Sequence, residues 1–233
     1  RSFMKVFFII LVLWLTPVWS AECQDFKFQE AHFTACTAKI PEDDIRLFLQ
    51  DQTGKIFGQF QELDNFLKEQ DLDIIFATNG GMYHADRSPV GMYVENFKEF
   101  SPLINREGPG NFGLLPNGVF CFNKKEFLIL ETKKFARSKI QCQYATQSGP
   151  LLVMDGKIHP KFIKDGTSKF VRSGVGISRD GLEAIFLISN QAVNFYHFAS
   201  TFLDHLKTDN ALYLDGNISR LYSPKLNRID FGF

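Results

Sequence analysis

The chain has 233 residues with 26 basic and 26 acidic side chains, so its formal net charge at pH 7 is zero. Proteins that bind nucleic acids or anionic membranes usually carry an excess of Lys and Arg, and we therefore expect no nucleic-acid partner. Hydrophobic residues make up 45% of the chain, and Phe alone occurs 26 times, which is enough for a large core. Since no linker or low-complexity tract interrupts the sequence, residues 22–233 are expected to form one domain.

The first 21 residues have the pattern of a secretory signal peptide. Met4-Lys5 is followed by an unbroken apolar stretch, Val6–Leu15, and then by small and polar residues up to Ala21. Residues 1–3 precede the expected initiator Met4 and are interpreted as an artefact. The apolar stretch is shorter than the ~20 residues that a membrane-spanning helix needs. We therefore expect cleavage near Ser20 or Ala21 and a secreted or periplasmic protein without stable membrane insertion; an uncleaved anchor is the alternative.

Four cysteines follow the leader, at positions 23, 36, 121 and 142. An even number of cysteines in an exported chain permits two disulfides, with three possible connectivities. The local pairs would be Cys23–Cys36 and Cys121–Cys142, although buried free cysteines are also common. Their long spacings lack a C-x-x-C pair and argue against a zinc site.

The first helix is expected over Gln59–Gln70, where Phe and Leu side chains recur on one face and charged residues occupy the other. A short apolar run, Asp73–Ala77, follows it and predicts a buried strand. This strand ends in Asn79-Gly80-Gly81, with Tyr83 and His84 just beyond. A glycine pair lets the backbone turn sharply and approach another molecule closely. The segment is either a tight turn or one side of a polar ligand site.

Hairpins are expected wherever Asp-Gly or Asn-Gly separates two apolar runs. The sequence predicts three of them, with turns at Asn117-Gly118, Asp155-Gly156 and Asp180-Gly181. A second helix is expected over His197–Thr208, followed by a strand at Ala211–Leu214. Together these elements predict an α+β fold, with a largely antiparallel or mixed sheet and two or three packed helices.

Three later segments place polar side chains beside turns or strand ends. Ser148-Gly149-Pro150 bends the chain before an apolar strand, Arg172 precedes a glycine-rich apolar run, and Asp215-Gly216 ends the strand after the second helix. Arg172 could pair with a surface acid or hold an anion with its fork of donors. Since no clear return strand follows Asp215-Gly216, we expect the strand end to aim Asp215, with Ser219 nearby.

The sequence contains none of the common signatures for serine hydrolases, zinc peptidases, P-loops or dinucleotide binding. Its histidines are scattered without the spacing of metal ligands, and no EF-hand pattern surrounds the Asp-Gly pairs. We therefore expect neither a metal site nor a cofactor.

Taken in order, four of these segments resemble the motifs of the phosphodiester glycosidase family. They are Asn79-Gly80-Gly81-Met82-Tyr83, Ser148-Gly149-Pro150, Arg172-Ser173-Gly174-Val175-Gly176, and Leu214-Asp215-Gly216 with Ser219. The chain departs from the family in the last motif, where Gly216-Asn217-Ile218-Ser219-Arg220 replaces a Gly-Gly-Gly-Ser-Ser pattern. Asn111-Phe112 and Ser88-Pro89-Val90-Gly91 are similar to those of a bacterial secreted branch.

The resemblance implies a hydrolase that removes a sugar from a sugar-1-phosphodiester. Arg172 would then stabilise the phosphate, helped by the N–H groups around Gly80-Gly81, and Asp215 would activate water or stabilise the oxocarbenium ion. Substrate contacts are expected from the remaining motif residues: Asn79, Gly80, Gly81, Tyr83, His84, Asn111, Ser148, Gly149 and Ser219. Ordinary glycosidases use a second carboxylate, for which Asp86, Glu95 and Glu107 are the candidates.

Two non-enzymatic functions remain open at this point. The same polar residues could bind a cell-envelope glycan without cleaving it, or they could only turn strands in a structural envelope protein. The expected partner is therefore a small sugar phosphodiester or an envelope glycan.

Overall fold

The computed structural model describes residues 21–230, and most of the expected signal peptide lies outside the described residues. Its largest sheet is antiparallel and has seven strands. In spatial order the strands are β1 (Glu22–Phe28), β2 (Ala31–Lys39), β12 (Glu183–Ser189), β11 (Ser173–Ile177), β13 (Asn210–Asp215), β9 (Leu151–Met154) and β10 (Lys157–Ile158). The sheet places β13 between β11 and β9, in the interior of the fold.

Two smaller antiparallel sheets accompany it. The five-stranded sheet has the order β5 (Lys98–Ser101), β4 (Tyr93–Glu95), β8 (Tyr144–Ser148), β6 (Gly118–Phe122) and β7 (Phe127–Glu131). The three-stranded sheet has the order β15 (Arg228–Ile229), β14 (Leu221–Ser223) and β3 (Ala77–Thr78). The helical segments are α1 (Phe60–Lys68), α2 (Thr132–Arg137), α3 (Phe195–Ser200), the π-helix η1 (Thr201–His205) and the 3₁₀ turn η2 (Pro224–Leu226). The expected α+β fold is confirmed.

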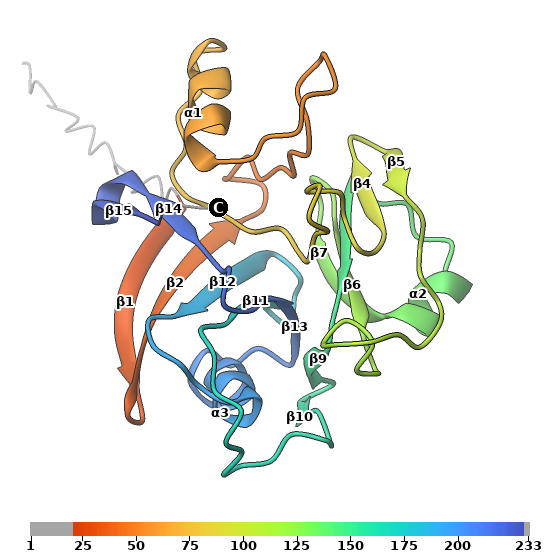
Figure 1. The fold of residues 1–233 in the computed structure, drawn as a ribbon, viewed down its shortest axis with the longest axis vertical. Helices are drawn as coiled ribbons and strands as arrows, with labels where there is room; N and C mark the ends of the chain where they lie inside the picture. The colour runs from red at the N-terminus through yellow and green to blue at the C-terminus, as the bar shows by residue number, and fades with distance from the viewer. Residues whose placement is uncertain (1–20, 231–233) are drawn as a thin grey trace, which may run out of the picture.

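The seven-stranded sheet is covered on both faces. On one face, Leu212 and Leu214 pack with Phe120 and Phe122 of the five-stranded sheet. On the other face, Tyr213 packs in a cluster with α3 and η1. Side chains alternate along a strand, so β13 contributes to both cores. Figure 1 shows α1 and α3 at opposite ends of the molecule, with the five-stranded sheet at the side.

Several local predictions are confirmed. Helix α1 lies within the expected range Gln59–Gln70, and the hairpins β9–β10 and β11–β12 turn at the expected Asp-Gly pairs. Both local disulfides are present, Cys23–Cys36 and Cys121–Cys142. Strand β13 contains the expected Ala211–Leu214.

Three local predictions are wrong in their detail. Asn117-Gly118 is not a hairpin turn, because the buried Asn117 donates to the Phe112 carbonyl and accepts from Thr132 Oγ1, and this fixes it as the start of β6. The strand expected at Asp73–Ala77 is reduced to β3, because only Ala77 and Thr78 have a partner strand, β14. The second helix begins at Phe195, earlier than predicted.

The second helix also changes type along its length. The Asn194 side chain accepts from the His197 N–H and caps the helix start. After Ser200 the helix widens into η1, where the Leu206 N–H bonds the Thr201 carbonyl five residues back. The apolar periodicity predicted a helix here, but it could not distinguish these two helical forms.

Candidate functional site at the end of strand β13

Asp215 lies at the last position of β13, directly opposite Ser173 at the start of β11. The pairing of β13 with β11 shifts register between Tyr213 and Asp215, as at a β-bulge, so the regular alternation of side chains is interrupted there. Leu214, the extra residue, packs into the core on the face opposite Tyr213, and the Asp215 charge still acts on the Tyr213 phenol. The sheet thus brings the last two predicted motifs together, because Arg172 immediately precedes Ser173.

The Asp215 carboxyl group is buried and only partly hydrogen-bonded. Its residue is 5% exposed, one carboxyl oxygen accepts from the Gly216 N–H at 2.7 Å, and Oδ2 has no hydrogen-bond partner among the described residues. Burial raises its pKa from 3.8 to about 6, against the opposing effects of the Gly216 N–H and the positive charge of Arg220. A carboxyl group with such a pKa can gain or lose a proton near neutral pH.

Arg172 is completely buried and is held by protein groups on every side. Its guanidinium stacks on Phe195 at 3.6 Å from the ring centroid, Nε donates to the Val193 carbonyl at 2.9 Å, and Nη2 donates to the Ser168 carbonyl at 3.2 Å. Burial lowers its pKa. No acidic residue within residues 21–230 forms an ion pair with it. Carbonyl dipoles and an aromatic face therefore stabilise this charge.

Tyr213 links Arg172 to the Asp215 turn. Its hydroxyl accepts from Arg172 Nη1 at 3.4 Å and lies near the Asn111 side chain, and burial raises its pKa to about 12. A Cβ atom built on Gly216 would lie 2.8 Å from this hydroxyl, so the turn passes directly beside it. Tyr213 is not among the site residues predicted from the sequence. The available signal was its position two residues before Asp215 on a strand.

Three serines surround the same strand end. Ser219 Oγ donates to Ser173 Oγ at 2.9 Å, and both residues are buried. From the neighbouring sheet, Ser148 Oγ donates to the Leu214 carbonyl at 3.2 Å. The structure therefore brings Ser148 and Ser219 close to the backbone on either side of Asp215.

Gly149 permits the close packing that carries Asn111 to this place. A Cβ atom at Gly149 would lie 2.5 Å from Asn117 Cβ and 3.1 Å from the Phe112 carbonyl oxygen. Any larger residue would push away the loop that holds Asn111 next to Tyr213. The second predicted motif thus has a positional role in the site.

The first predicted motif lies beside the last one. Asn79 Oδ1 accepts from the Arg220 N–H at 2.8 Å, and Thr78 Oγ1 donates to the Arg220 carbonyl at 3.0 Å. These bonds fix the end of β3 to the loop that follows Asp215. Gly81 permits a second close approach, because a Cβ atom there would lie 2.7 Å from Thr146 Oγ1.

Tyr83 and His84 differ in their positions. Tyr83 is half-buried; burial raises its pKa, as does the nearby negative charge of Asp215. Arg87 Nη1 donates to the Tyr83 hydroxyl at 3.5 Å. His84 is exposed on a turn closed by its N–H and the Ser88 carbonyl. Tyr83 therefore belongs to the surroundings of Asp215 more clearly than His84 does.

The candidates for a second carboxylate all lie in other environments. Asp86 and Glu107 are exposed, and Asp86 accepts from the Ser88 hydroxyl. Glu95 is in the five-stranded sheet, where it accepts from the Leu49 N–H and the Tyr93 hydroxyl. None of these contacts connects them to Asp215.

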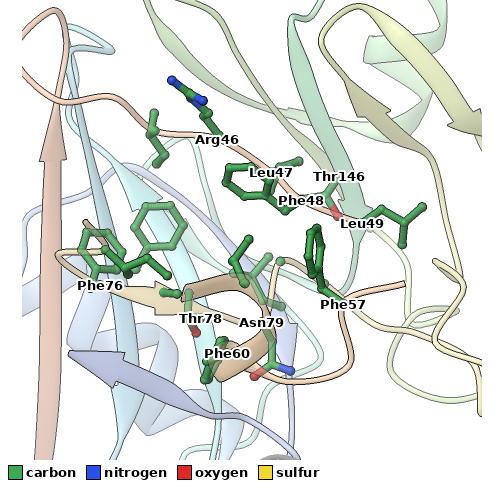
Figure 2. A pocket seen from close by; sticks show the side chains of 18 of the residues that line it. Arg46, Leu47, Phe48, Leu49, Phe57, Phe60, Phe76, Thr78, Asn79 and Thr146 are labelled. Carbon is green, nitrogen blue, oxygen red and sulfur yellow. The ribbon is translucent and has the colours of Figure 1, made fainter. Parts of the chain in front are cut away.

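A cavity of about 450 Å³ lies between α1, the segment 43–60, β3 and the two larger sheets. Figure 2 shows aromatic and aliphatic side chains around it, with polar atoms from Arg46, Thr78, Asn79 and Thr146. Asn79, Gly80, Gly81 and Tyr83 belong to its lining, and so does Leu214 of β13. Arg172, Ser148 and Asp215 are not lining residues. The predicted residues thus divide between the cavity and the adjacent strand end.

Two further properties bear on what the protein can bind. Across the described part of the chain, no three His, Cys, Asp or Glu side chains are grouped so that they could hold a metal ion. In the same part, no helix has the length and apolarity needed to cross a membrane.

Comparison with known proteins adds independent evidence. The chain is 34% identical over 216 residues to the uncharacterized protein YigE of Escherichia coli (strain K12), an alignment that covers 92% of this chain and 84% of that protein. A hypothetical protein from Synechocystis has a similar structure, with a TM-score of 0.53 and 14% identity; the match covers 87% of this chain and 57% of that one.

A second solved structure is the catalytic domain of zebrafish N-acetylglucosamine-1-phosphodiester alpha-N-acetylglucosaminidase, auto-inhibited by its pro-peptide. It matches with a TM-score of 0.50 and 16% identity over 91% of this chain and 75% of that one. At these identities, both structural matches establish a shared fold. Residues 73–228 match the family described as phosphodiester glycosidase, and this range contains all four predicted motifs. The chain therefore belongs to the phosphodiester glycosidase family.

Proposed function

We propose that this protein is an exported hydrolase that cleaves a sugar-1-phosphodiester between the anomeric carbon and its oxygen. Asp215 Oδ2 is the observation that carries the proposal, since it is buried without a hydrogen-bond partner in the described structure. Buried polar atoms are nearly always hydrogen-bonded, and exceptions concentrate at functional sites. An oxygen in this state, on a carboxyl group with a raised pKa, suits proton transfer to or from a bound molecule.

The reaction requires water to attack the anomeric carbon as its bond to the phosphate oxygen breaks. The bonding electrons leave with the phosphate, which becomes a phosphomonoester anion, and the sugar gains the water oxygen. We assign Asp215 to accept the proton of that water or, in an alternative role, to stabilise the oxocarbenium ion. A phosphate is a stable leaving group, so it needs stabilisation of negative charge more than protonation by a second carboxylate.

We assign Arg172 to act on the phosphate through Tyr213. Arg172 Nη1 donates to the Tyr213 hydroxyl oxygen, and because a guanidinium cannot accept, the hydroxyl proton is directed elsewhere. Beside the Asp215–Gly216 turn, this proton could be donated to an oxygen of the departing phosphate. In this arrangement Tyr213 is the contacting donor and the fully buried Arg172 is a positioning residue.

The remaining predicted residues are proposed to bind the substrate. Asn79, Ser148 and Ser219 offer amide and hydroxyl groups around the strand end, and Gly80 and Gly81 line the adjoining cavity. Tyr83 would supply a wall for the sugar. We further propose that the protein acts outside the cytoplasm, since two disulfides are typical of an oxidising compartment.

The test is hydrolysis of an aryl sugar-1-phosphodiester by the purified protein in ¹⁸O-labelled water. The proposal predicts label in the released sugar, because attack at carbon breaks the bond between carbon and oxygen. Label in the phosphate instead would identify a phosphodiesterase and contradict the assignment. A sugar phosphate that raises the melting temperature without being cleaved would favour a glycan-binding protein. Neither turnover nor a thermal shift would leave only a structural role.

A further inference from the structure

The cavity beside the proposed site is walled mainly by apolar side chains. Its lining comes from α1, the segment 43–60, the approach to β3 and the facing sheets. Its phenylalanines are Phe48, Phe57, Phe60, Phe76, Phe120, Phe122 and Phe186. Figure 2 shows the labelled rings of Phe57, Phe60 and Phe76 around the cavity. Its volume of about 450 Å³ falls in the range of sites for small organic ligands.

Such a cavity is poorly suited to a sugar. Pyranose rings carry hydroxyl groups on most of their carbons, and each would lose hydrogen bonds with water against a wall of Phe and Leu. A hydrocarbon chain has the opposite preference, since its transfer from water into an apolar cavity is favourable. The lining therefore selects for an alkyl, acyl or isoprenoid chain.

One end of the cavity is polar and suits the headgroup of such a chain. Asn79, Gly80, Gly81 and Tyr83 line it there together with Arg87. Arg87 Nη1 donates to the Gly58 carbonyl and the Tyr83 hydroxyl, at 3.4 and 3.5 Å, and its guanidinium lies over the Tyr83 ring, but it forms no ion pair with any acid in the described chain. A cation without an acidic partner at the end of an apolar cavity is complementary to an anionic group on an apolar ligand.

The polar end also leads to the proposed catalytic group. Tyr83 is close enough to Asp215 for the carboxylate charge to raise the pKa of its phenol, which burial also raises. The Arg220 N–H on Asn79 Oδ1 joins the cavity lining to the loop that follows Asp215. A phosphodiester near Tyr83 could thus present its sugar toward Asp215 while its other ester group extends into the cavity.

We propose that the cavity holds the hydrocarbon chain of the alcohol half of the substrate, so that the substrate is a lipid-linked sugar-1-phosphate. This inference rests on the proposed function for the sugar and phosphate, and on the cavity alone for the lipid. Hydrolysis would release the sugar and leave a lipid phosphomonoester whose chain is still in the cavity.

The experiment compares sugar-1-phosphodiesters that share one sugar and differ only in their alcohol: methyl, butyl, hexyl and decyl. KM should fall with each added methylene, by up to about fourfold for a fully buried group, while kcat changes little. Binding is measured separately from turnover by the thermal shift with butyl phosphate and decyl phosphate, which have no sugar to lose. All compounds are used below their critical micelle concentrations.

A matched pair of variants tests whether the hydrocarbon chain binds in this cavity. Leu63 lines the cavity from α1, whereas Asn65 is exposed on the same helix. Leu63→Trp should fill part of the cavity, abolish the thermal shift with decyl phosphate and raise KM for the decyl substrate at least tenfold, while the methyl substrate is unaffected. Asn65→Trp adds the same side chain outside the cavity and should leave all these values unchanged. The chain-length series on the unmodified protein does not depend on either variant folding.

The outcomes separate this inference from the proposed function. Hydrolysis of every substrate with a KM independent of chain length would overturn the lipid proposal and leave the glycosidase proposal intact. A chain-length-dependent thermal shift without hydrolysis would support the lipid site and reject the enzymatic function. Because Ala21 lines the cavity, both measurements are repeated after removal of residues 1–20. If KM and the thermal shift depend on chain length only after this removal, the lipid site exists in the processed protein. If neither depends on chain length in either form, the lipid proposal is overturned.

Discussion

At the end of β13, polar side chains are held by paired strands on both sides, whereas the cavity below α1 is walled in part by the irregular segment 43–58. The first region is buried, and among residues 21–230 its Asp215 Oδ2 has no hydrogen-bond partner and its Arg172 guanidinium has no acidic partner. The second is apolar and hollow. Chemistry requires fixed distances between reacting groups, which strands supply. A cavity for a flexible chain needs volume and apolar surface more than fixed geometry.

Replacement of Asp215 by Asn tests the catalytic role assigned to the buried polar region, and it should have the largest effect. If Asp215 transfers the proton of the attacking water, kcat should fall on the order of 10³-fold, because an amide cannot act as a base. The measurement is turnover of an aryl sugar-1-phosphodiester, with decyl phosphate binding as the control. Binding should persist, since Asp215 does not line the cavity. Unchanged turnover would remove Asp215 from the mechanism.

The same variant should be more stable than the unmodified protein at neutral pH. Burial raises the pKa of Asp215 from 3.8 to about 6, so the folded state binds its proton more tightly than the unfolded state does. The contribution of Asp215 to stability is therefore fully present below pH 3.8 and is lost as the pH rises through about 6. Asp215→Asn avoids a loss of up to roughly 3 kcal/mol at pH 7. Thermal unfolding should show a higher melting temperature for the variant at pH 7 and a smaller difference near pH 4.

Equal melting temperatures at pH 7 would show that the carboxylate is better solvated or better paired than the structure indicates. That result would also weaken the observation on which the proposed function depends. A lower melting temperature for the variant at pH 7 would instead mean that the ionised group stabilises the fold, as a structural ion pair does.

Tyr213→Phe tests whether the Tyr213 hydroxyl, which Arg172 positions, acts in catalysis or only stabilises the fold. The substitution keeps the ring, which packs against Phe195 with centroids 4.9 Å apart, and removes the hydroxyl that accepts from Arg172. Loss of one donor to a developing anion costs on the order of 10² in kcat. The Arg172 donor left without an acceptor should destabilise the fold by about 1–3 kcal/mol.

A steady-state assay distinguishes the two effects, provided that it is run well below the melting temperature. A large fall in kcat with nearly constant KM supports donation by Tyr213 in the transition state. If only stability falls and kcat is maintained, then the Arg172–Tyr213 pair serves the fold alone. Tyr144→Phe offers a control, because that hydroxyl bonds Asn96 in the other sheet.

The sequence predicted the parts of this arrangement that depend on local chemistry. Asp-Gly pairs between apolar runs predicted the hairpins β9–β10 and β11–β12, and apolar periodicity predicted α1. Short sequence separations favoured the two disulfides that the structure contains. The resemblance in four motifs led to the family that the comparisons establish.

Features that depend on long-range packing escaped prediction. Tyr213 lies in an apolar strand, and its role depends on Arg172, 41 residues earlier in the chain. Asn117-Gly118 has the composition of a hairpin turn, but buried bonds to Phe112 and Thr132 determine its conformation. The cavity arises because the irregular segment 43–60 folds back over two sheets, and no periodicity in that segment indicates such a path.

The smallest expected effect comes from the cavity wall. Phe198 is fully buried in α3, and its replacement by Ala should cost about 3–5 kcal/mol. Phe57 lines the cavity, is half-buried and contacts Phe66 with ring centroids 5.1 Å apart. Because part of its ring already faces open space, Phe57→Ala should cost only about 1 kcal/mol. Urea unfolding of both variants gives the comparison directly.

The ratio of these two costs tests whether the cavity is open in solution. If Phe57→Ala costs as much as Phe198→Ala, its ring must be packed on all sides, which means that the segment 43–60 closes over the hollow when no ligand is bound. If Phe57→Ala lowers the unfolding free energy only slightly without ligand but strongly with decyl phosphate, the Phe57 ring contacts the bound chain. A ligand that binds only the folded protein adds to its stability, and Phe57→Ala would lose the share of that gain contributed by contact between the ring and the chain.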